Sequence, residues 1–274
     1  MGVTNWRADF QDALLQRGFH VDLVTDTGFS LFYIIGSRVL VNCLSIVNTF
    51  TAEQTLALQR RLHDEGYQVI NLWEDVWRTR AAQVLNRITS LCGQNIRIHG
   101  RKTNIVLLAK PEADKFLSAF HIQGPALSRY KYGLIYAGEL VAVATFSGTR
   151  LMRQQAEGYR SAELIRFATK TGYTVTGGLT KLIKHFASQV KSNDIMSYAD
   201  RDWSTGKGYE VAGFKFQSLI PPAELWVNTS TYKRYFKHRV PLAAVRRDNL
   251  EEATPEFEFV KIFNTGNLKY VLYL

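Results

Sequence analysis

The chain has 274 residues, and 46% of them are hydrophobic, which is enough apolar material for one large or two ordinary folded domains. Disorder is therefore excluded. The 34 Lys and Arg residues outnumber the 24 Asp and Glu residues, and the resulting net charge of +10 favours a polyanionic partner or an anionic cofactor. Up to Arg97 the sequence holds 9 Arg, no Lys and 9 acidic residues, so the whole excess lies beyond that residue.

The cysteine content indicates a reducing compartment, and the hydropathy indicates a soluble protein. Cys43 and Cys92 make neither a disulfide framework nor a zinc pattern, and we expect both to be buried thiols. No apolar run reaches about 18 residues, and the start of the sequence has no signal-peptide pattern. We expect a soluble cytoplasmic protein with no membrane partner, whose oligomeric state the sequence leaves open.

The first part of the chain alternates between helical and strand-like periodicity. Thr51 and Gln54 have the spacing of a capping box, and Gly18 and Gly66 stand where helices end. A helix, a strand meander, and then helix, strand and helix are expected here. The predicted helices are 6–17, 51–65 and 74–91, and the predicted strands are 20–24, 30–35, 39–47 and 68–72.

After about residue 97 the composition changes and lysines appear. Strands are predicted at 105–108, 132–136, 140–146, 161–168, 195–199 and 214–219, with helices at 111–120 and 178–190 and a short helix near Tyr209. Such alternation is typical of a mixed α/β or α+β domain. We therefore expect two domains, 1–97 and 98–274.

A glycine pair marks the strongest local pattern of the second domain. Gly177 and Gly178 follow a predicted strand and open an amphipathic helix, where free N–H groups and the helix dipole favour phosphate. A plain tight turn is the alternative. Another strand and the pattern Tyr-x-x-x-Gly-Phe, which starts at Tyr209, follow this helix. This order resembles that of GNAT-type acyltransferases.

The GNAT resemblance implies an acyl-CoA donor such as acetyl-CoA. It places the pyrophosphate of the donor on Gly177, Gly178 and Lys181, and it makes Tyr209 the acid that protonates the departing thiolate. A phenol is neutral at pH 7 and therefore suits this role. The phosphate turn of these enzymes is usually rich in glutamine or arginine, and this sequence does not reproduce that feature.

Four short motifs carry a more specific resemblance. In their order they resemble the C-terminal domain of phage Hef-type homing endonucleases and, more distantly, the phage Mom family of GNAT-like enzymes that modify adenine in DNA. The sequence 261–270 also resembles the Hef-type terminus. The four motifs are His121–Gly124, Glu163–Phe167, Ser197–Arg201 and Gly206–Phe214.

The Mom-like pattern implies a catalytic set of His121, Arg166, Asp200 and Tyr209. His or Asp can take a proton from an exocyclic amine, and Arg can bind a carbonyl, a phosphate or a carboxylate. Each residue also has an ordinary structural interpretation. His121 can be a surface residue, Asp200 can cap the loop that follows it, and Arg166 can pair with a nearby carboxylate.

The order of elements in the first domain resembles the N-terminal nuclease domain of the Hef-type proteins, a PD-(D/E)XK or Vsr-like restriction-endonuclease fold. Metal-assisted cleavage in that fold needs carboxylates and a lysine. Asn42 stands where the acid is expected, and no lysine occurs through Arg97. We therefore interpret residues 1–97 as a degenerate nuclease domain that now serves DNA binding, interaction or structure. No residue is assigned to a metal, and metal binding is left open.

A basic and aromatic segment is the first candidate for nucleic-acid contact. Residues 231–239 interleave four positive charges with three aromatic rings, which suits phosphate contact and base stacking. The basic stretches 97–102 and 150–160 are further candidates, and a solubilising basic face is the alternative for all three. The residues expected to bind nucleic acid are Tyr232, Lys233, Arg234, Tyr235, Lys237 and Arg239.

Three functions are compatible with these patterns. The first is a phage-type GNAT-like transferase that modifies a DNA base or a related amine with an acyl-CoA-type donor, acting in the host cytoplasm. The second is a Hef-like homing endonuclease or its catalytically inactive DNA-binding descendant. The third is an accessory protein that binds DNA or a partner without catalysis. If the transferase hypothesis holds, the central strands should part beside Gly177, with the four catalytic candidates around one pocket.

Overall fold

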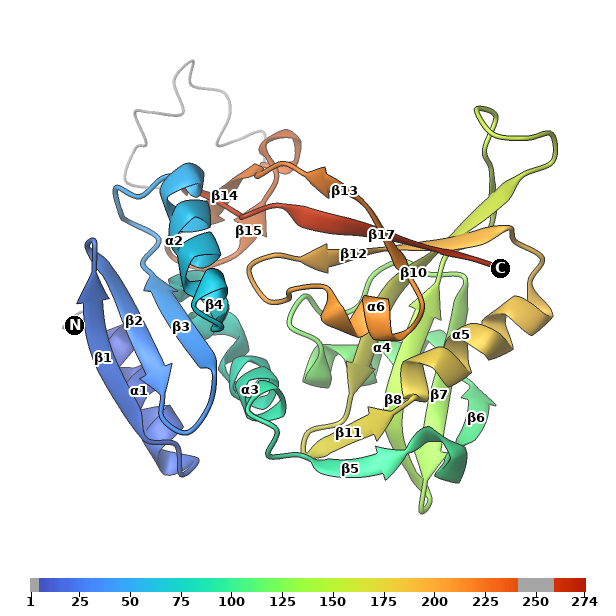
Figure 1. The fold of residues 1–274 in the computed structure, drawn as a ribbon, viewed down its shortest axis with the longest axis horizontal. Helices are drawn as coiled ribbons and strands as arrows, with labels where there is room; N and C mark the ends of the chain where they lie inside the picture. The colour runs from blue at the N-terminus through green and yellow to red at the C-terminus, as the bar shows by residue number, and fades with distance from the viewer. Residues whose placement is uncertain (1–4, 241–258) are drawn as a thin grey trace. The chain divides into compact units, whose positions relative to one another are not determined.

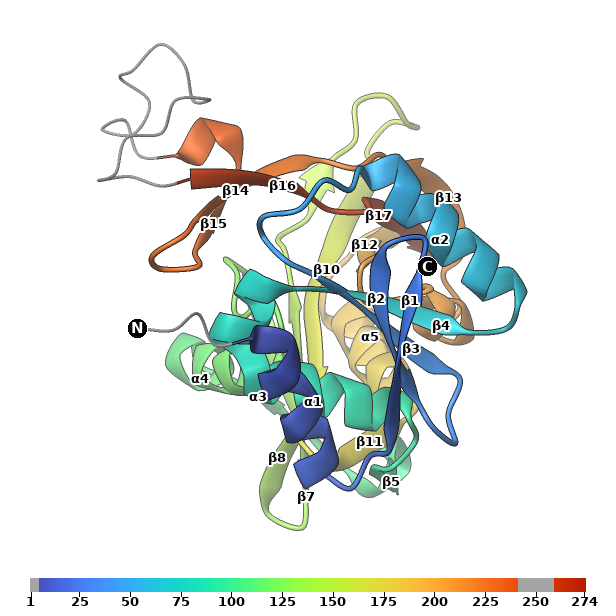
Figure 2. The ribbon, with the colours of Figure 1, turned by 90° about the vertical axis from the view of Figure 1, so that its left-hand side faces the viewer.

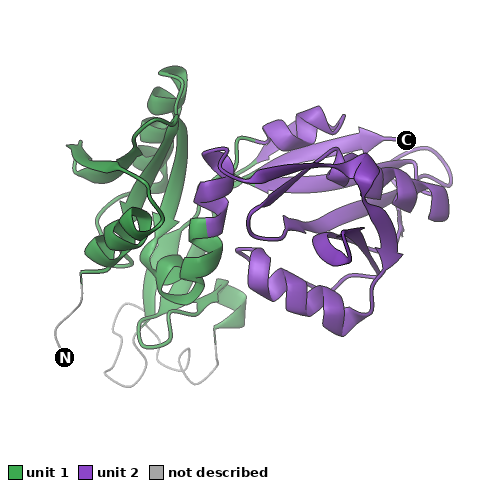
Figure 3. Cartoon of the chain, turned by 90° about the horizontal axis from the view of Figure 1, so that it is seen from below, with its two compact units in different colours: residues 1–85, 200–205, 220–267 green, residues 86–199, 206–219, 268–274 purple. Residues whose placement is uncertain are grey.

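The computed structural model describes residues 5–240 and 259–274. The chain forms two compact units that interleave along the sequence (Figure 3). Unit 1 contains residues 1–85, 200–205 and 220–267, and unit 2 contains residues 86–199, 206–219 and 268–274. The expected domains, 1–97 and 98–274, are continuous stretches, whereas two later segments of the chain return to unit 1. The boundary between the two expected domains stays a prediction.

Unit 1 is built on a four-stranded sheet of order β1-β2-β3-β4 (Figure 1). The first three strands are antiparallel, and β3 and β4 are parallel because α2 carries the chain from one to the other. The elements are α1 (Trp6–Gln16), β1 (Val21–Asp26), β2 (Phe29–Ile34), β3 (Val39–Leu44), α2 (Ala52–Asp64), β4 (Gln68–Trp73) and α3 (Glu74–Leu91).

The predicted capping box at the start of α2 is confirmed. The Gln54 backbone N–H donates to the Thr51 hydroxyl at 3.2 Å, and the Thr51 N–H donates to the Gln54 side chain at 2.9 Å. Helix α3 has the predicted bounds, but Arg80 inside it has a non-helical φ of −141°. The helix is therefore kinked near its middle, which its periodicity did not predict.

Apolar side chains cover both faces of the unit 1 sheet, because alternate residues of a strand point to opposite sides. On one face Phe10 of α1 meets Phe32 of β2 and Trp77 of α3, with ring centroids 5.4 and 5.1 Å apart. On the other face Leu31 of β2 belongs to a buried cluster with Leu58 of α2. This double coverage explains why every residue of β3 is buried.

A small second sheet completes the core of unit 1. It has the order β15-β14-β16, and its strands are β14 (Glu224–Asn228), β15 (Arg234–Tyr235) and β16 (Phe259–Phe263). Leu225, Val227 and Ile262 from these strands are buried in the same cluster as Leu31 and Leu58. The sequence analysis predicted none of these strands.

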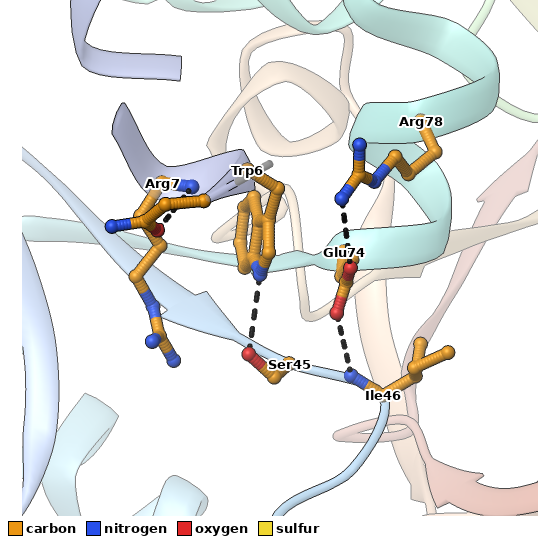
Figure 4. Close-up of polar contacts among 7 residues, drawn as sticks. Trp6, Arg7, Ser45, Ile46, Glu74 and Arg78 are labelled. Carbon is orange, nitrogen blue, oxygen red and sulfur yellow. Dashed lines mark hydrogen bonds and ion pairs between the residues drawn. The ribbon is translucent and has the colours of Figure 1, made fainter. Parts of the chain in front are cut away.

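The end of β3 is held by the first turns of two helices (Figure 4). The Trp6 indole N–H donates to the Ser45 hydroxyl at 3.1 Å, and the Ile46 N–H donates to the Glu74 carboxylate at 3.4 Å. Arg78 also donates to Glu74, at 3.4 Å. These polar groups are therefore engaged in tying α1 and α3 to the strand.

Unit 2 is built on a sheet of order β13-β17-β12-β10-β8-β7-β6, with β9 paired to β10. Its strands are β6 (Asn104–Leu107), β7 (Tyr130–Tyr136), β8 (Glu139–Phe146), β9 (Arg150–Leu151), β10 (Arg160–Thr169), β12 (Asp194–Asp200), β13 (Lys215–Ile220) and β17 (Asn267–Tyr273). Its helices are α4 (Lys110–Phe120), α5 (Gly178–Gln189) and α6 (Lys207–Val211). A separate parallel pair joins β5 (Ile96–His99) to β11 (Tyr173–Thr176), and a short 3-10 helix, η1 (Gly100–Lys102), follows β5.

Helices cover both faces of the unit 2 sheet at β8 (Figure 2). Phe146 of β8 stacks on Phe186 of α5 with centroids 4.3 Å apart. Val143, which points the other way, packs in a cluster with Phe116 and Leu117 of α4. The strand in the middle is therefore buried on both sides, like β3 of unit 1.

The expected mixed α/β class is confirmed in both units. Unit 2 also contains the order that carries the GNAT resemblance, in which β11, the glycine turn, α5, β12 and the tyrosine helix α6 follow one another. No helix in residues 5–240 and 259–274 is long and apolar enough to cross a membrane.

We predict that residues 1–97 expressed alone do not fold cooperatively, because the unit 1 core would lose Leu225, Val227 and Ile262. Thermal unfolding followed by circular dichroism, with the whole chain as control, tests this. A sharp transition for the fragment near that of the whole chain would contradict it.

Candidate active site

The candidate site of unit 2 begins where β10 and β12 stop pairing. The two parallel strands are in register from Ser161 and Asp194 to Glu163 and Met196. At the next position the Ser197 hydroxyl, instead of the backbone, contacts the Leu164 carbonyl at 2.9 Å. The register of β10 with β8 also shifts between Leu164 and Arg166. The irregular backbone therefore lies on the strand segment that carries Arg166.

Tyr209 of α6 faces this irregular segment. Its hydroxyl lies 3.0 Å from the Ser197 hydroxyl and 3.5 Å from the Tyr198 carbonyl. Burial raises the pKa of Tyr209, although the Ser197 hydrogen bond and the nearby Arg87 and Arg166 act in the opposite direction. The phenol is therefore protonated at neutral pH and able to donate.

Packing against other aromatic rings fixes the orientation of Tyr209. Its ring stacks on Tyr270 with centroids 5.5 Å apart and meets the edge of Phe214 at 5.4 Å. Tyr270 is held in turn by a hydrogen bond to Glu210 of 3.1 Å. Gly206, which precedes α6, has a φ of +83°, and a Cβ there would lie 2.1 Å from the Tyr270 hydroxyl. Only glycine fits at this position.

Arg166 holds the loop that follows α4. Its Nε donates to the Gly124 carbonyl at 3.1 Å, and its Nη1 donates to the Ile165 carbonyl at 2.9 Å. The Gly124 N–H donates in turn to the His121 carbonyl at 2.9 Å. Arg166 therefore connects two of the predicted motifs, the histidine loop and the central strand.

His121 is less suited to the role of a base than the resemblance implied. Burial lowers the pKa of His121 to about 3, and the Arg166 and Arg87 guanidiniums act in the same direction. The Gln123 N–H also donates to its Nδ1 at 3.1 Å, which places the proton of the neutral ring on Nε2. His121 is thus a neutral hydrogen-bond donor at physiological pH.

Arg87 is a residue of this neighbourhood that the sequence analysis missed. It lies near the end of α3 and acts electrostatically on both His121 and Tyr209, as Arg166 does. Three of the four predicted catalytic residues, His121, Arg166 and Tyr209, are therefore brought together, with a second guanidinium beside them. Arg87 was not predicted because, in the sequence, its position on an amphipathic helix resembles that of any solvent-facing arginine.

Asp200 is the fourth predicted catalytic residue. It ends β12 and belongs to unit 1. Its carboxylate accepts from the Asp202 N–H at 3.0 Å, and its carbonyl accepts from the N–H groups of Trp203 and Ser204. These bonds match the structural alternative, in which Asp200 caps the loop that follows it. Its catalytic role stays a prediction.

The glycine turn lies beside the basic stretch 97–102. Gly177 has a φ of +73° before α5, and a Cβ on Gly100 would lie 3.1 Å from the Gly177 carbonyl carbon. The Lys181 ammonium is engaged by the carbonyls of Gly100, at 3.0 Å, and of Thr103. Lys181, the predicted phosphate ligand, therefore ties η1 to α5, and phosphate binding at the turn stays a prediction.

A buried polar network occupies the position in unit 1 where the nuclease acid was expected. The fully buried Asn42 of β3 donates to Asn71 of β4 at 3.1 Å. Asn71 contacts the buried Asp202 carboxylate at 3.5 Å, and Thr265 donates to the same oxygen from its hydroxyl at 2.7 Å. In the described ranges no group of three or more His, Cys, Asp or Glu residues is arranged to hold a metal ion.

Arg234, predicted to bind nucleic acid, forms an ion pair within unit 1. Its guanidinium forms two hydrogen bonds to the buried Asp75 carboxylate, at 2.6 and 2.9 Å. Tyr235 packs edge-on against Phe259, and the Lys233 ammonium lies 5.2 Å from the Tyr235 ring. The charge of Arg234 is therefore paired with Asp75, and a contact of this segment with nucleic acid stays a prediction.

The positive charge of the chain is concentrated in unit 2. By sequence, unit 2 has 19 Lys and Arg residues against 7 Asp and Glu residues, a net charge of +12. Unit 1 has 15 against 17, a net charge of −2, although it contains the segment 231–239. The anionic ligand that the charge implies is therefore expected on unit 2.

No family model and no curated protein matches this chain. Solved structures similar to it include a Bacillus subtilis acetyltransferase in complex with CoA, at 15% identity and a TM-score of 0.37, and a GNAT family acetyltransferase from Elizabethkingia anophelis with acetyl-CoA bound, at 13% and 0.34. An IAA acetyltransferase from Bacillus cereus has 14% identity and a TM-score of 0.35. Each match covers 63% of this chain and 99% of the other. Because these TM-scores lie below 0.5, we base the functional proposal on the geometry of the chain itself.

We predict that Gly206→Ala lowers the melting temperature by several degrees, since the new Cβ would displace Tyr270 and strain the backbone. Gly208→Ala is the matched control, because no atom lies within 4 Å of its Cβ position. Differential scanning calorimetry of both variants measures the effect. Equal melting temperatures would contradict the packing of Tyr209 on Tyr270.

We also predict that the ionisation of Asp202 destabilises the fold as pH rises from about 4 to 7, so that the wild type loses stability relative to Asp202→Asn over this window. Burial and, next, Asp200 raise the pKa of Asp202 from 3.8 to about 7, so the folded state binds more protons than the unfolded chain in this window. The difference in stability between Asp202→Asn and the wild type should therefore grow with pH and favour the variant at pH 8, while the lowered pKa of His121 acts equally in both proteins.

Urea unfolding at pH 5, 6, 7 and 8 measures this dependence on pH. Asp22→Asn, which removes an exposed carboxylate from β1, is the control for the change in net charge. If the wild type and Asp202→Asn have parallel stability curves, the ionisation of Asp202 is not linked to folding.

Proposed function

We propose that the protein is an acyltransferase that takes an acyl group from acetyl-CoA or a similar acyl-CoA and transfers it to an amine of a DNA base or a related compound. The observation that carries this proposal is the protonated Tyr209 hydroxyl beside the place where β10 and β12 cease to pair. The GNAT resemblance implies that the thioester of the donor lies beside this hydroxyl. A protonated phenol fits that position.

The donor is expected to bind across the start of α5. The N–H groups after Gly177 point along the helix axis and, with the helix dipole, favour a pyrophosphate. The exposed side chains of Arg101 and Lys102 follow Gly100, whose backbone lies against Gly177. The residues present therefore fit an anionic donor, although Lys181 itself holds the neighbouring turn.

The role of Tyr209 follows from its protonation state. An acyl-CoA supplies a thioester whose carbon–sulfur bond breaks when an amine nitrogen attacks the carbonyl carbon. Tyr209 holds a proton that can pass to the departing sulfur, and the proton that the attacking nitrogen loses restores the phenol. The Ser197 hydroxyl orients the phenol. His121 is neutral with its proton on Nε2, so it suits donation to a carbonyl or ring acceptor better than proton removal.

Charge supports an anionic acceptor. Unit 2 has a net charge of +12, and Arg87 and Arg166 lie beside both His121 and Tyr209. Guanidinium groups match phosphate and carboxylate oxygens geometrically. A nucleic acid whose base carries an exocyclic amine satisfies both requirements, and the Mom-like motif order favours the same acceptor.

The alternative, a Hef-like endonuclease, is less well supported. Asn42 takes the place of the acid, and the adjacent carboxylates of Asp202 and Asp75 are buried and bonded to Thr265 and Arg234. Catalytic carboxylates must reach a metal ion and a solvent-accessible phosphodiester. We propose instead that unit 1 has a structural or binding role, as expected for a degenerate nuclease-like unit.

We predict that cells expressing the wild-type protein contain a modified DNA nucleoside and that Tyr209→Phe abolishes it, because phenylalanine has no proton to give. Nucleoside mass spectrometry measures the product. Calorimetric binding of acetyl-CoA to the variant is the control, and we expect it to be within about threefold of the wild type, since the turn at Gly177 is unchanged. A wild type that makes no product and binds no acyl-CoA would refute the proposal.

A further inference from the structure

A projecting basic segment, which we call the arginine arm, lies between β8 and β10. It consists of residues 147–160 and includes Arg150, Arg153 and Arg160, all of which are exposed. In Figure 1 it is the yellow-green loop that extends beyond the sheet of unit 2. Arg129 joins it, because its side chain lies against Gly148, within 3.2 Å of where a Cβ would stand.

Hydrogen bonds fix the base of the arginine arm on both sides. The Glu163 N–H donates to the Ser147 hydroxyl at 2.9 Å, and the Ser147 N–H donates to the Glu163 carbonyl at the same distance. On the other side the Arg160 N–H donates to the Asn193 side chain at 2.8 Å, and Tyr159 donates to Asp194 at 2.7 Å. The arm therefore extends from a rigid stem.

The stem adjoins the candidate active site within unit 2. Glu163, which anchors the arm, belongs to the last in-register pair of β10 with β12. Arg150 and Glu163 both act electrostatically on Tyr198, whose side chain is 38% exposed. The Tyr198 carbonyl lies 3.5 Å from the Tyr209 hydroxyl. The arm is thus anchored on the strand segment that immediately precedes the opening.

The arginines of the arm have the character of a phosphate-binding surface. Among the described residues, no ion pair involves Arg129, Arg150, Arg153 or Arg160. Four exposed guanidiniums, of which that of Arg150 acts electrostatically on the exposed Tyr198, suit phosphate contacts combined with base stacking. The segment 231–239 differs, because Arg234 is neutralised by Asp75 and its unit has a net charge of −2.

We infer that the arginine arm binds the phosphate backbone of a nucleic acid and leads it to the opening beside Tyr209. The inference that the bound nucleic acid is the acceptor of the acyl group rests on the proposed acyl transfer, whereas its binding to the arginine arm does not. Residues 231–239, the first candidate from the sequence, are not the main contact.

Two triple variants that remove the same charge separate the two surfaces. The test variant is Arg150→Gln, Arg153→Gln and Arg160→Gln, and the control is Lys233→Gln, Lys237→Gln and Arg239→Gln. Fluorescence anisotropy with labelled single-stranded and double-stranded DNA of about 20 nucleotides, at several salt concentrations, gives the affinity and its salt dependence. Melting temperatures verify that both variants are folded.

We expect the test variant to bind at least tenfold more weakly than the wild type at about 0.1 M salt. Its slope of log K against log salt should be shallower by about 2 to 3, since each lost phosphate contact removes about 0.7 to 0.9. Replacing the same three arginines with lysine should restore most of the slope, because the charge returns. The control variant should retain the affinity and slope of the wild type.

The inference fails if the control variant loses affinity and the test variant does not. It also fails if the wild type binds vesicles containing an anionic phospholipid but no DNA. Calorimetry with acetyl-CoA on the same proteins separates the two proposals. DNA binding through the arm without acetyl-CoA binding would refute the acyl transfer alone, whereas acetyl-CoA binding with arm-independent DNA binding would refute the arm alone.

Discussion

The contact of the Ser197 hydroxyl with the Leu164 carbonyl is the interaction on which the proposed site depends. Two parallel strands that begin in register would ordinarily continue their backbone hydrogen bonds, which leaves no room for a ligand. Here a side chain takes over at the first unpaired position and also reaches Tyr209. One hydroxyl therefore contacts the Leu164 carbonyl and positions the proposed acid, while Tyr270 and Gly206 fix the Tyr209 ring.

The two units divide the physical roles between them. In unit 1 the polar residues Asp75, Asp202 and Arg234 form hydrogen bonds to partners within the same unit. Such groups are costly to bury, and they stabilise the unit only when every partner is present. Unit 2 instead has a net charge of +12, with arginines exposed on the arm and others beside Tyr209. This charge supports the proposal that unit 2 binds both an anionic donor and an anionic acceptor.

Local patterns predicted local structure well, and long-range partners set the limit. The capping box at Thr51 and the bounds of α3 depend on neighbouring residues, so the sequence was sufficient. Arg234 was assigned to nucleic acid because its partner, Asp75, lies 159 positions away. The order of motifs predicted Tyr209 as a site residue. Arg87 was not predicted, because it acts electrostatically on Tyr209 only when the chain is folded. The C-terminal strands were missed because basic and polar residues conceal their short apolar runs.

Hydrogen exchange measured by mass spectrometry, with and without acetyl-CoA, tests the central claim most directly. The account predicts slower amide exchange in two segments of unit 2, 176–182 at the glycine turn and 197–209 from the end of β12 to α6, because a donor bound along α5 and between the strands shields both. Exchange in 29–44 of unit 1 should not change. Protection of unit 1 alone, or of no segment at saturating acetyl-CoA, would contradict it.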